Sequence, residues 1–326
     1  MMAAFYFGCG ASMIAAALSP NFIALAASLF ALGMFAAIYH PVGMAMLIEL
    51  SKARGRTLAF NGVCGNMGAA LAAGITAALA SFIGWRGAFM IPALLCIASG
   101  VVYVVLVGDD RHRTGRRQSV AEVALAPRAA VVMFILYIVI SLASGLVFNT
   151  VSVALPKIVD ERIAGLSLLA VGGLTTAVFL CGAVAQLAMG RLVERFQPLF
   201  LFAGVVAVQF FGILWAANAS GAMLLAALAL TMSTIYGQVT AGDIVIARYT
   251  ADAWRGRIYA VRYFLTFVSS AAAVSAIAVL HARGGFDLVL AAIAACAAVL
   301  VITVQAFVFL VVGAERQLRR VVQPAE

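Results

Sequence analysis

Long apolar runs separated by short polar turns set the pattern of this chain. Residues 1–48 contain no Asp, Glu, Lys or Arg, and at about 20 residues per crossing this length allows two membrane spans. Ser19, Pro20 and Asn21 mark the turn between them. The apolar runs are continuous and do not alternate with polar residues, so they indicate helices and exclude a transmembrane barrel.

The same length argument predicts ten membrane-spanning helices. We place them at about residues 2–18, 22–48, 57–83, 87–107, 129–153, 165–189, 198–217, 221–247, 257–280 and 287–313. A signal peptide over residues 1–18 is the competing interpretation. It fails because no basic segment precedes the apolar run and another span follows almost at once.

Composition agrees with a lipid environment. Hydrophobic residues make up 65% of the chain and charged residues only 10%, whereas a soluble domain carries about a quarter charged residues. This leaves too little polar surface to cover a water-soluble globule. The predicted fold class is therefore an all-α polytopic membrane protein.

Residue types and spacing argue against several functions. The net charge of +9 comes from arginines in short loops, not from a stripe along a polar face, so no nucleic-acid partner is expected. Five scattered cysteines and three separate histidines predict no disulfide framework, metal site, cofactor or enzyme active site. The chain has no Walker-type phosphate loop, which argues against direct use of ATP.

The distribution of Lys and Arg predicts the orientation. When loops are assigned to alternate sides of the membrane, 17 basic residues fall on one side and four on the other. Those four are Arg86, Lys157, Arg162 and Arg283. The positive-inside rule then places both termini and the long loop 108–128 in the cytoplasm.

The loop 108–128 divides the chain into two predicted domains. An amino-terminal bundle of four spans occupies residues 1–107, and a carboxy-terminal bundle of six spans occupies residues 129–326. We interpret the basic loop as a solvated connection whose arginines set the topology. Contact with anionic lipid headgroups is the alternative.

An internal repeat at an offset near 200 residues relates the two domains. The turn Arg54-Gly55-Arg56 aligns with Arg255-Gly256-Arg257, and Gly84-Trp85-Arg86-Gly87 aligns with Gly284-Gly285-Phe286-Asp287. Residues 129–196 have no counterpart in the first half. We therefore expect a duplicated twelve-span architecture that lacks its first two spans, with a natural ten-span protein as the alternative.

The local motifs resemble those of the major facilitator superfamily of secondary transporters. They are Tyr39-His40-Pro41 with Gly43, Arg54-Gly55-Arg56, Asn61-Gly62, Gly65-Asn66-Met67-Gly68, Gly84-Trp85-Arg86-Gly87-Ala88-Phe89, and the loop Gly190-Arg191-Leu192-Val193-Glu194-Arg195. They look most similar to exporters of the fosmidomycin-resistance type. The first signature loop is absent, and Ala72-Ala73 stand where a glycine-proline pair is usual.

This resemblance implies two helical bundles around a central cavity, in a bacterial inner membrane, with transport by alternating access. It implies a small organic solute as substrate and protons as the coupling ion, with efflux favoured over uptake. A monomer is the default oligomeric state. The alternative function is that of a truncated, non-transporting membrane protein.

His40 and Asp243 are the ionisable candidates within predicted spans. Neutral and charged imidazole both exist at cellular pH, so His40 could carry a proton; the alternative is a neutral histidine bonded to a carbonyl freed at the Pro41 kink. Asp243 could bind a proton or a cationic group of the solute. Its alternative is an ion pair with Arg248 or Arg262.

Further polar residues complete the predicted site. Tyr39, Asn149, Tyr236 and Gln238 are candidates for binding the solute or a proton. The residues predicted to form cytoplasmic gates are Glu49, Arg54, Arg56, Gly190, Arg191, Glu194, Arg195, Asp252, Arg255 and Arg257. Simple topology signalling is the alternative for most of these arginines. For Gly62, Gly65, Gly68 and Gly74, close helix packing is the preferred interpretation.

Overall fold

The computed structural model describes residues 1–43, 46, 54–107, 127–249 and 252–322, and all of its regular elements there are helical. The chain divides into two compact units. The first unit consists of residues 1–118 and 167–173, and the second of residues 119–166 and 174–326. The predicted domain connection at 108–128 lies almost entirely outside the described residues.

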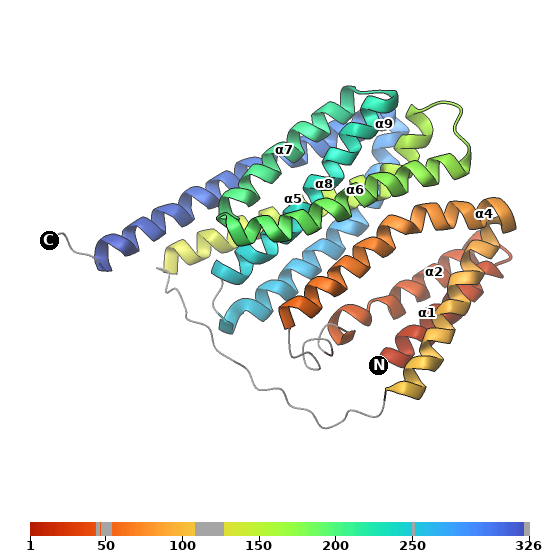
Figure 1. Cartoon of the computed structure of the whole chain (residues 1–326). Helices are drawn as coiled ribbons and strands as arrows, with labels where there is room; N and C mark the ends of the chain where they lie inside the picture. The colour runs from red at the N-terminus through yellow and green to blue at the C-terminus, as the bar shows by residue number, and fades with distance from the viewer. Residues whose placement is uncertain (44–45, 47–53, 108–126, 250–251, 323–326) are drawn as a thin grey trace. The chain divides into compact units, whose positions relative to one another are not determined.

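The first unit contains helices α1 (Met2–Ala17), α2 (Phe22–Ala36) and α4 (Arg54–Leu106), with a π-helical turn, η1 (Tyr39–Gly43), after α2 (Figure 1). The turn predicted between α1 and α2 is confirmed. Asn21 caps the start of α2, because its side-chain oxygen accepts a hydrogen bond from the backbone N–H of Ala24 at 2.8 Å.

The span predicted over residues 22–48 is not a single α-helix in its described part. Helix α2 ends at Ala36, and the five residues of η1 follow with a wider, π-type turn. Pro41 lies inside this turn. A proline has no N–H to donate to the carbonyl four residues earlier, so a helix through this position must bend or change its hydrogen-bond pattern.

The second unit is built from helix α5 (Pro127–Arg162), most of α6 (Leu168–Arg195), α7 (Pro198–Asn218), α8 (Gly221–Tyr249) and α9 (Asp252–Val322). A core of buried side chains from α5, α7 and α9, with members from α6 and α8, holds it together. Its larger members include Met133, Ile140, Leu199, Phe202, Val206, Leu300, Val304 and Phe307.

Helices α4 and α9 each double back at glycine, as Figure 1 shows. The break in α4 is at Gly84 (φ 77°, ψ 167°), and the break in α9 is at Gly284 and Gly285, where Gly285 has φ 60° and ψ −159°. Both positive-φ conformations belong to a region that essentially only glycine occupies. The two turns predicted from the 200-residue repeat are therefore confirmed.

The broken helices reconcile the structure with the predicted number of spans. Six helices in the described part are long and apolar enough to cross a membrane by length and composition, and α1 and α2 are shorter apolar helices. Two of the six, α4 and α9, each contain two helical segments. Ten apolar segments result, and their order follows the predicted layout.

Close helix packing in the described part involves one of the predicted glycines and others that were not predicted. A Cβ at Gly172 of α6 would lie 3.5 Å from the Cα of Gly74 of α4, as the packing prediction for Gly74 expects. A Cβ at Gly145 of α5 would lie 2.9 Å from Ser269 Cβ of α9, and a Cβ at Gly10 of α1 would lie 3.1 Å from the backbone oxygen of Ala93 of α4. By contrast, a Cβ at Gly62, Gly65 or Gly68 meets no described atom within 4 Å. The packing prediction for those three glycines is not supported, because their Cα atoms do not face a neighbouring helix in the described part.

Substituting the turn glycines tests this architecture. Gly84→Ala and Gly285→Ala should each destabilise the protein by about 1–3 kcal/mol, because a Cβ is strained in these conformations. Gly204→Ala within α7 is the matched control: its Cβ would meet nothing within 4 Å, and alanine favours a helix over glycine. Thermal unfolding in detergent measures all three, and wild-type stability of the two turn variants would contradict the assignment.

Candidate functional site

An ion pair inside the second unit joins α8 to α9. Arg262 Nη1 donates a hydrogen bond directly to Asp243 Oδ1. Asp243 lies six residues before the end of α8 and Arg262 ten residues after the start of α9. At the helical rise per residue, these positions are about 9 Å and 15 Å from the helix ends. The pair therefore lies within the helices and not in a loop.

The two partners differ in exposure. The Arg262 side chain is 21% exposed, whereas the Asp243 side chain is 46% exposed. Tyr137 of α5 lies beside Arg262, and Ser141 of α5 and Tyr263 of α9 lie next to Tyr137. The structure shows the ion pair with Arg262 that the sequence analysis gave as the alternative to a binding role for Asp243, and the Arg248 side chain lies outside those described. A binding role for Asp243 stays a prediction.

Amide side chains fasten α5 to the helices around it. Gln238 Nε2 of α8 donates to Ser144 Oγ of α5 at 2.5 Å. Asn149 Nδ2 donates to the Gly145 carbonyl within α5 at 2.8 Å and to the Thr266 carbonyl of α9 at 3.4 Å. In a membrane interior such interhelical hydrogen bonds satisfy groups that lipid cannot. Asn149 and Gln238 therefore have a structural role, and contact with a solute stays a prediction.

Tyr236 occupies the interior of the second unit. Its side chain is 1% exposed, and its ring lies 6.1 Å, centroid to centroid, from that of Phe148 of α5. A Cβ at Gly182 of α6 would lie 2.9 Å from the Tyr236 ring. The tyrosine thus fills the space between α5, α6 and α8. As the structure stands, a solute would have to displace one of these neighbours to reach it.

Tyr39 belongs to a polar contact in the first unit. Its hydroxyl donates to Asn61 Oδ1 of α4 at 2.5 Å, and the Phe5 ring of α1 lies 5.5 Å away. This contact joins the π-helical turn η1 to α4. The backbone of His40 lies in the same turn, but its side chain is outside those described.

The predicted cytoplasmic gates are only partly described. Glu49 lies outside the described residues, as do the side chains of Arg54, Arg56, Asp252, Arg255 and Arg257. Arg191, Glu194 and Arg195 lie exposed at the end of α6, and a Cβ at Gly190 would meet nothing within 4 Å. A gating role for all of these residues stays a prediction.

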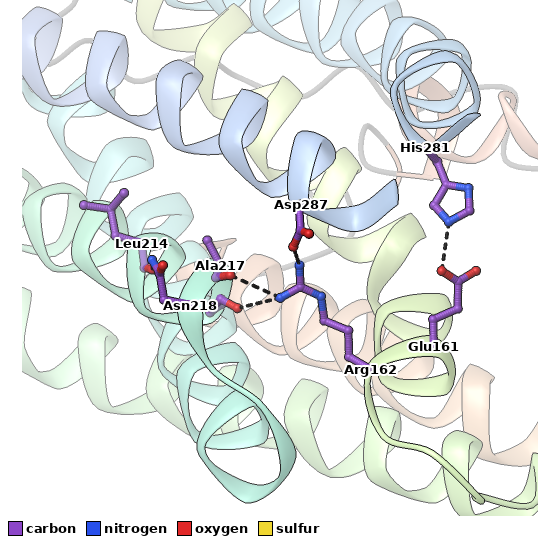
Figure 2. Close-up of polar contacts among 8 residues, drawn as sticks. Glu161, Arg162, Leu214, Ala217, Asn218, His281 and Asp287 are labelled. Carbon is purple, nitrogen blue, oxygen red and sulfur yellow. Dashed lines mark hydrogen bonds and ion pairs between the residues drawn. The ribbon is translucent and has the colours of Figure 1, made fainter. Parts of the chain in front are cut away.

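A polar cluster that the sequence did not predict lies where α5 and α7 end and α9 turns (Figure 2). Arg162, at the end of α5, donates through Nη1 to the carbonyl oxygens of Ala216 and Ala217 at 3.4 and 3.2 Å. Its Nη2 forms an ion pair with Asp287 of α9. One guanidinium therefore connects the ends of three helices and sits at the negative end of the α7 dipole.

Three further ion pairs involve side chains of the last turns of α5. His281 Nε2 of α9 lies 2.9 Å from Glu161 Oε2 of α5, as Figure 2 shows. Lys157 lies 3.3 Å from both Asp160 and Glu161. Sequence reasoning counted Lys157 and Arg162 only as topology signals. Their position on the side poor in basic residues was the available clue that they had another role.

The first unit uses arginine in a comparable way. Arg86, just after the break in α4, donates through Nη2 to the carbonyl oxygen of Ser19 at 3.2 Å, directly after α1. Its guanidinium lies 4.4 Å from the Trp85 ring centroid. Helices α1 and α7 correspond at the 200-residue offset. Each of these equivalent helices thus has an arginine at its carboxyl end: Arg86 comes from α4 just after its break, and Arg162 comes from the end of α5.

Comparison with known proteins identifies the family. The family model described as "Major Facilitator Superfamily" matches residues 1–274. The chain belongs to this superfamily. The superfamily consists of transporters, so the protein is a multi-pass membrane transporter and not an enzyme. A search of curated proteins found no match.

Solved structures agree with the superfamily fold. A variant of the E. coli fucose:proton symporter FucP has a TM-score of 0.65 at 14% identity, covering 93% of this chain and 81% of FucP. A bacterial homologue of the human lysosomal transporter Spinster, in an inward-facing and occupied conformation, has a TM-score of 0.62 at 14% identity and covers 96% and 80%. At this identity the likeness establishes the fold alone.

The arginine at the end of α5 gives a stability prediction for this superfamily member. Arg162→Gln should cost about 1–3 kcal/mol, because two helix-end carbonyls and a carboxylate lose their partner. Arg162 is 16% exposed, whereas Lys157 is 57% exposed, so Lys157→Gln should change stability by less than about 0.5 kcal/mol. Thermal unfolding in detergent compares the two, and equal losses would contradict the proposed capping.

Proposed function

We propose that this chain is a proton-coupled transporter of a small organic solute that works by alternating access, with Asp243 as the residue that takes up the proton. The observation that carries the proposal is the ion pair between Asp243 and Arg262 within two membrane-spanning helices. Ionisable groups at such depth are costly and are typically functional. A carboxylate that is half exposed can exchange protons while its partner stays in place.

Two further observations support the coupling ion and the direction. FucP is described as a fucose:proton symporter, and it shares the fold of this chain. The motifs around Asn61 and Gly84 resemble exporters of the fosmidomycin-resistance type, which favours efflux over uptake. The excess of basic residues in one set of loops supports a bacterial inner-membrane protein with both termini in the cytoplasm.

His40 is the second proton site in this proposal. It follows Tyr39, whose hydroxyl is bonded to Asn61, so its backbone lies in a turn that is tied to α4. π-Helical turns of this kind occur frequently at functional sites. A histidine here could pass a proton at cellular pH, in parallel with Asp243 in the other unit.

Proton movement in reconstituted vesicles tests the proposal. The purified chain is placed in liposomes containing a pH-sensitive dye, and a panel of organic solutes is added under a solute gradient. At least one solute should drive proton movement in wild-type vesicles. Asp243→Asn should abolish that movement, because an amide cannot take up the proton, and His40→Ala should reduce it.

The control and the contradicting outcomes are specific. Arg283→Gln changes an exposed residue in the α9 turn and should leave proton movement unchanged. Solute-driven proton movement that survives in both Asp243→Asn and His40→Ala would remove the site assignment. If the wild-type protein moves no solute from the panel, with or without protons, the alternative of a non-transporting membrane protein gains support.

A further inference from the structure

The ion pair restricts what can happen when Asp243 takes up a proton. Protonation turns the carboxylate into a neutral acid, so Arg262 loses the negative charge beside it. The Arg262 side chain is 21% exposed, and a mostly buried cation without a counter-charge is strongly unfavourable. Proton uptake is therefore favourable only if another anion approaches the guanidinium.

The described surroundings of Arg262 contain no replacement anion. Tyr137, which lies beside Arg262, carries an uncharged hydroxyl group, and so do Ser141 and Tyr263, which lie next to Tyr137. Among the described side chains of α5 and α9, the other acidic groups are Asp160, Glu161 and Asp287 at the opposite helix ends. None of these described carboxylates lies beside Arg262 to supply the replacement charge, whereas a bound anionic ligand could supply it.

The local sequence also favours an anionic ligand. Between Asp243 and Arg262 the chain carries two acidic residues, Asp243 and Asp252, against four arginines at positions 248, 255, 257 and 262. When Asp243 is protonated, the positive excess of this segment increases by one. A field of this sign attracts anions and repels cations.

We infer that the solute is a small organic anion, and that its carboxylate or phosphonate group binds the Arg262 guanidinium when a proton neutralises Asp243. This inference rests on the proposed proton-coupled transport. The planar guanidinium suits either group, because both can accept two parallel N–H hydrogen bonds. The adjacent Tyr137 hydroxyl can donate a further hydrogen bond to the same anion.

The exchange balances in protons and charge. Asp243 gains one proton at a carboxylate oxygen, and its contact with Arg262 breaks. One monovalent anion then accepts the released N–H groups of Arg262. The net charge of the site is unchanged, so one proton and one anion bind together and move in the same direction. Net transport then follows the sum of the proton and anion gradients, which permits export of an organic acid.

Calorimetric binding to the purified full chain in detergent tests the inference. The probes are benzoate, phenylphosphonate and benzamide. Benzamide has nearly the same shape as benzoate but no charge, so comparing the two isolates the contribution of the charge. Benzoate stays ionised between mildly acidic and neutral pH, so its wild-type affinity should fall by up to about tenfold for each unit rise in pH above the point where Asp243 loses its proton. Benzamide should not bind, and the two anions distinguish a carboxylate from a phosphonate ligand.

Substitutions separate the roles of the two partners. Asp243→Asn mimics the protonated acid, so benzoate binding should become independent of pH and at least as tight as the strongest wild-type binding. Arg262→Gln should abolish binding, and Arg262→Lys should retain a weaker affinity because it keeps the charge without the planar fork. Arg283→Gln is the control and should match the wild type.

Several outcomes would overturn the inference. These are binding of benzamide as tight as that of benzoate, anion binding that survives in Arg262→Gln, or failure of both anions to bind the Asp243→Asn variant. The double variant Asp243→Asn with Arg262→Gln replaces the ion pair by two neutral amides and leaves no unpaired charge. If this variant elutes like the wild type in size-exclusion chromatography and binds no anion, its loss of binding is not caused by misfolding. The vesicle assay distinguishes failure of this inference from failure of the proposed function. Anions that bind Arg262 without driving proton movement would support the anion site and contradict proton-coupled transport. Proton movement driven only by neutral solutes would support proton-coupled transport and contradict the anion site.

Discussion

A charge placed inside a membrane-spanning helix must find its counter-charge within the protein. Lipid offers neither water nor counter-ions, so an uncompensated charge at that depth is costly. The contact between Asp243 and Arg262 meets this requirement in the second unit. It also makes the two residues dependent on each other, because any change in the charge of one alters the stability of the other. The proposed proton coupling and the proposed anion specificity both depend on this relation between the two residues.

The same constraint explains polar contacts elsewhere in the chain. Arg86 and Arg162 donate to carbonyls at the ends of α1 and α7, where helices have unsatisfied acceptors. Asn149 and Gln238 use their amides to hold α5 against α9 and α8. Polar side chains that the sequence suggests as lining a transport path therefore form hydrogen bonds with backbone carbonyls and with side chains of neighbouring helices. This division of roles also explains why a few arginines are tolerated on the side poor in basic residues.

Much of the fold could be predicted from the sequence because it depends on length and spacing. The order of the apolar segments and the glycine turns at Gly84 and Gly285 were among the predictions, and the structure agrees with them. The ion pair of Asp243 with Arg262 was only the alternative to a binding role for Asp243. The superfamily match supports the same fold class. The length of an apolar run predicts a membrane-spanning helix, and the offset of an internal repeat predicts the positions of corresponding turns.

The sequence could not predict which face of each membrane helix packs against its neighbours, and the reason is physical. In lipid, both the buried and the exposed faces of a helix are apolar, so hydrophobic periodicity does not reveal which face packs. Phe211 and Trp215 lie exposed on α7 while Val206 and Ile213 of the same helix are buried. The open positions of Gly62 and its neighbours, and the burial of Tyr236, were missed for this reason. The turn η1 was missed because a proline signals a bend but not its type.

The most direct test of the central claim follows the Asp243 carboxyl group itself. Infrared difference spectra of the wild-type protein and of Asp243→Asn, recorded from neutral to acidic pH, isolate the carbonyl band of the protonated acid. Adding benzoate at constant pH should increase this band, because the anion takes over Arg262 and leaves Asp243 to bind a proton. A band that does not respond to benzoate would show that proton and anion binding are independent, and would contradict the account.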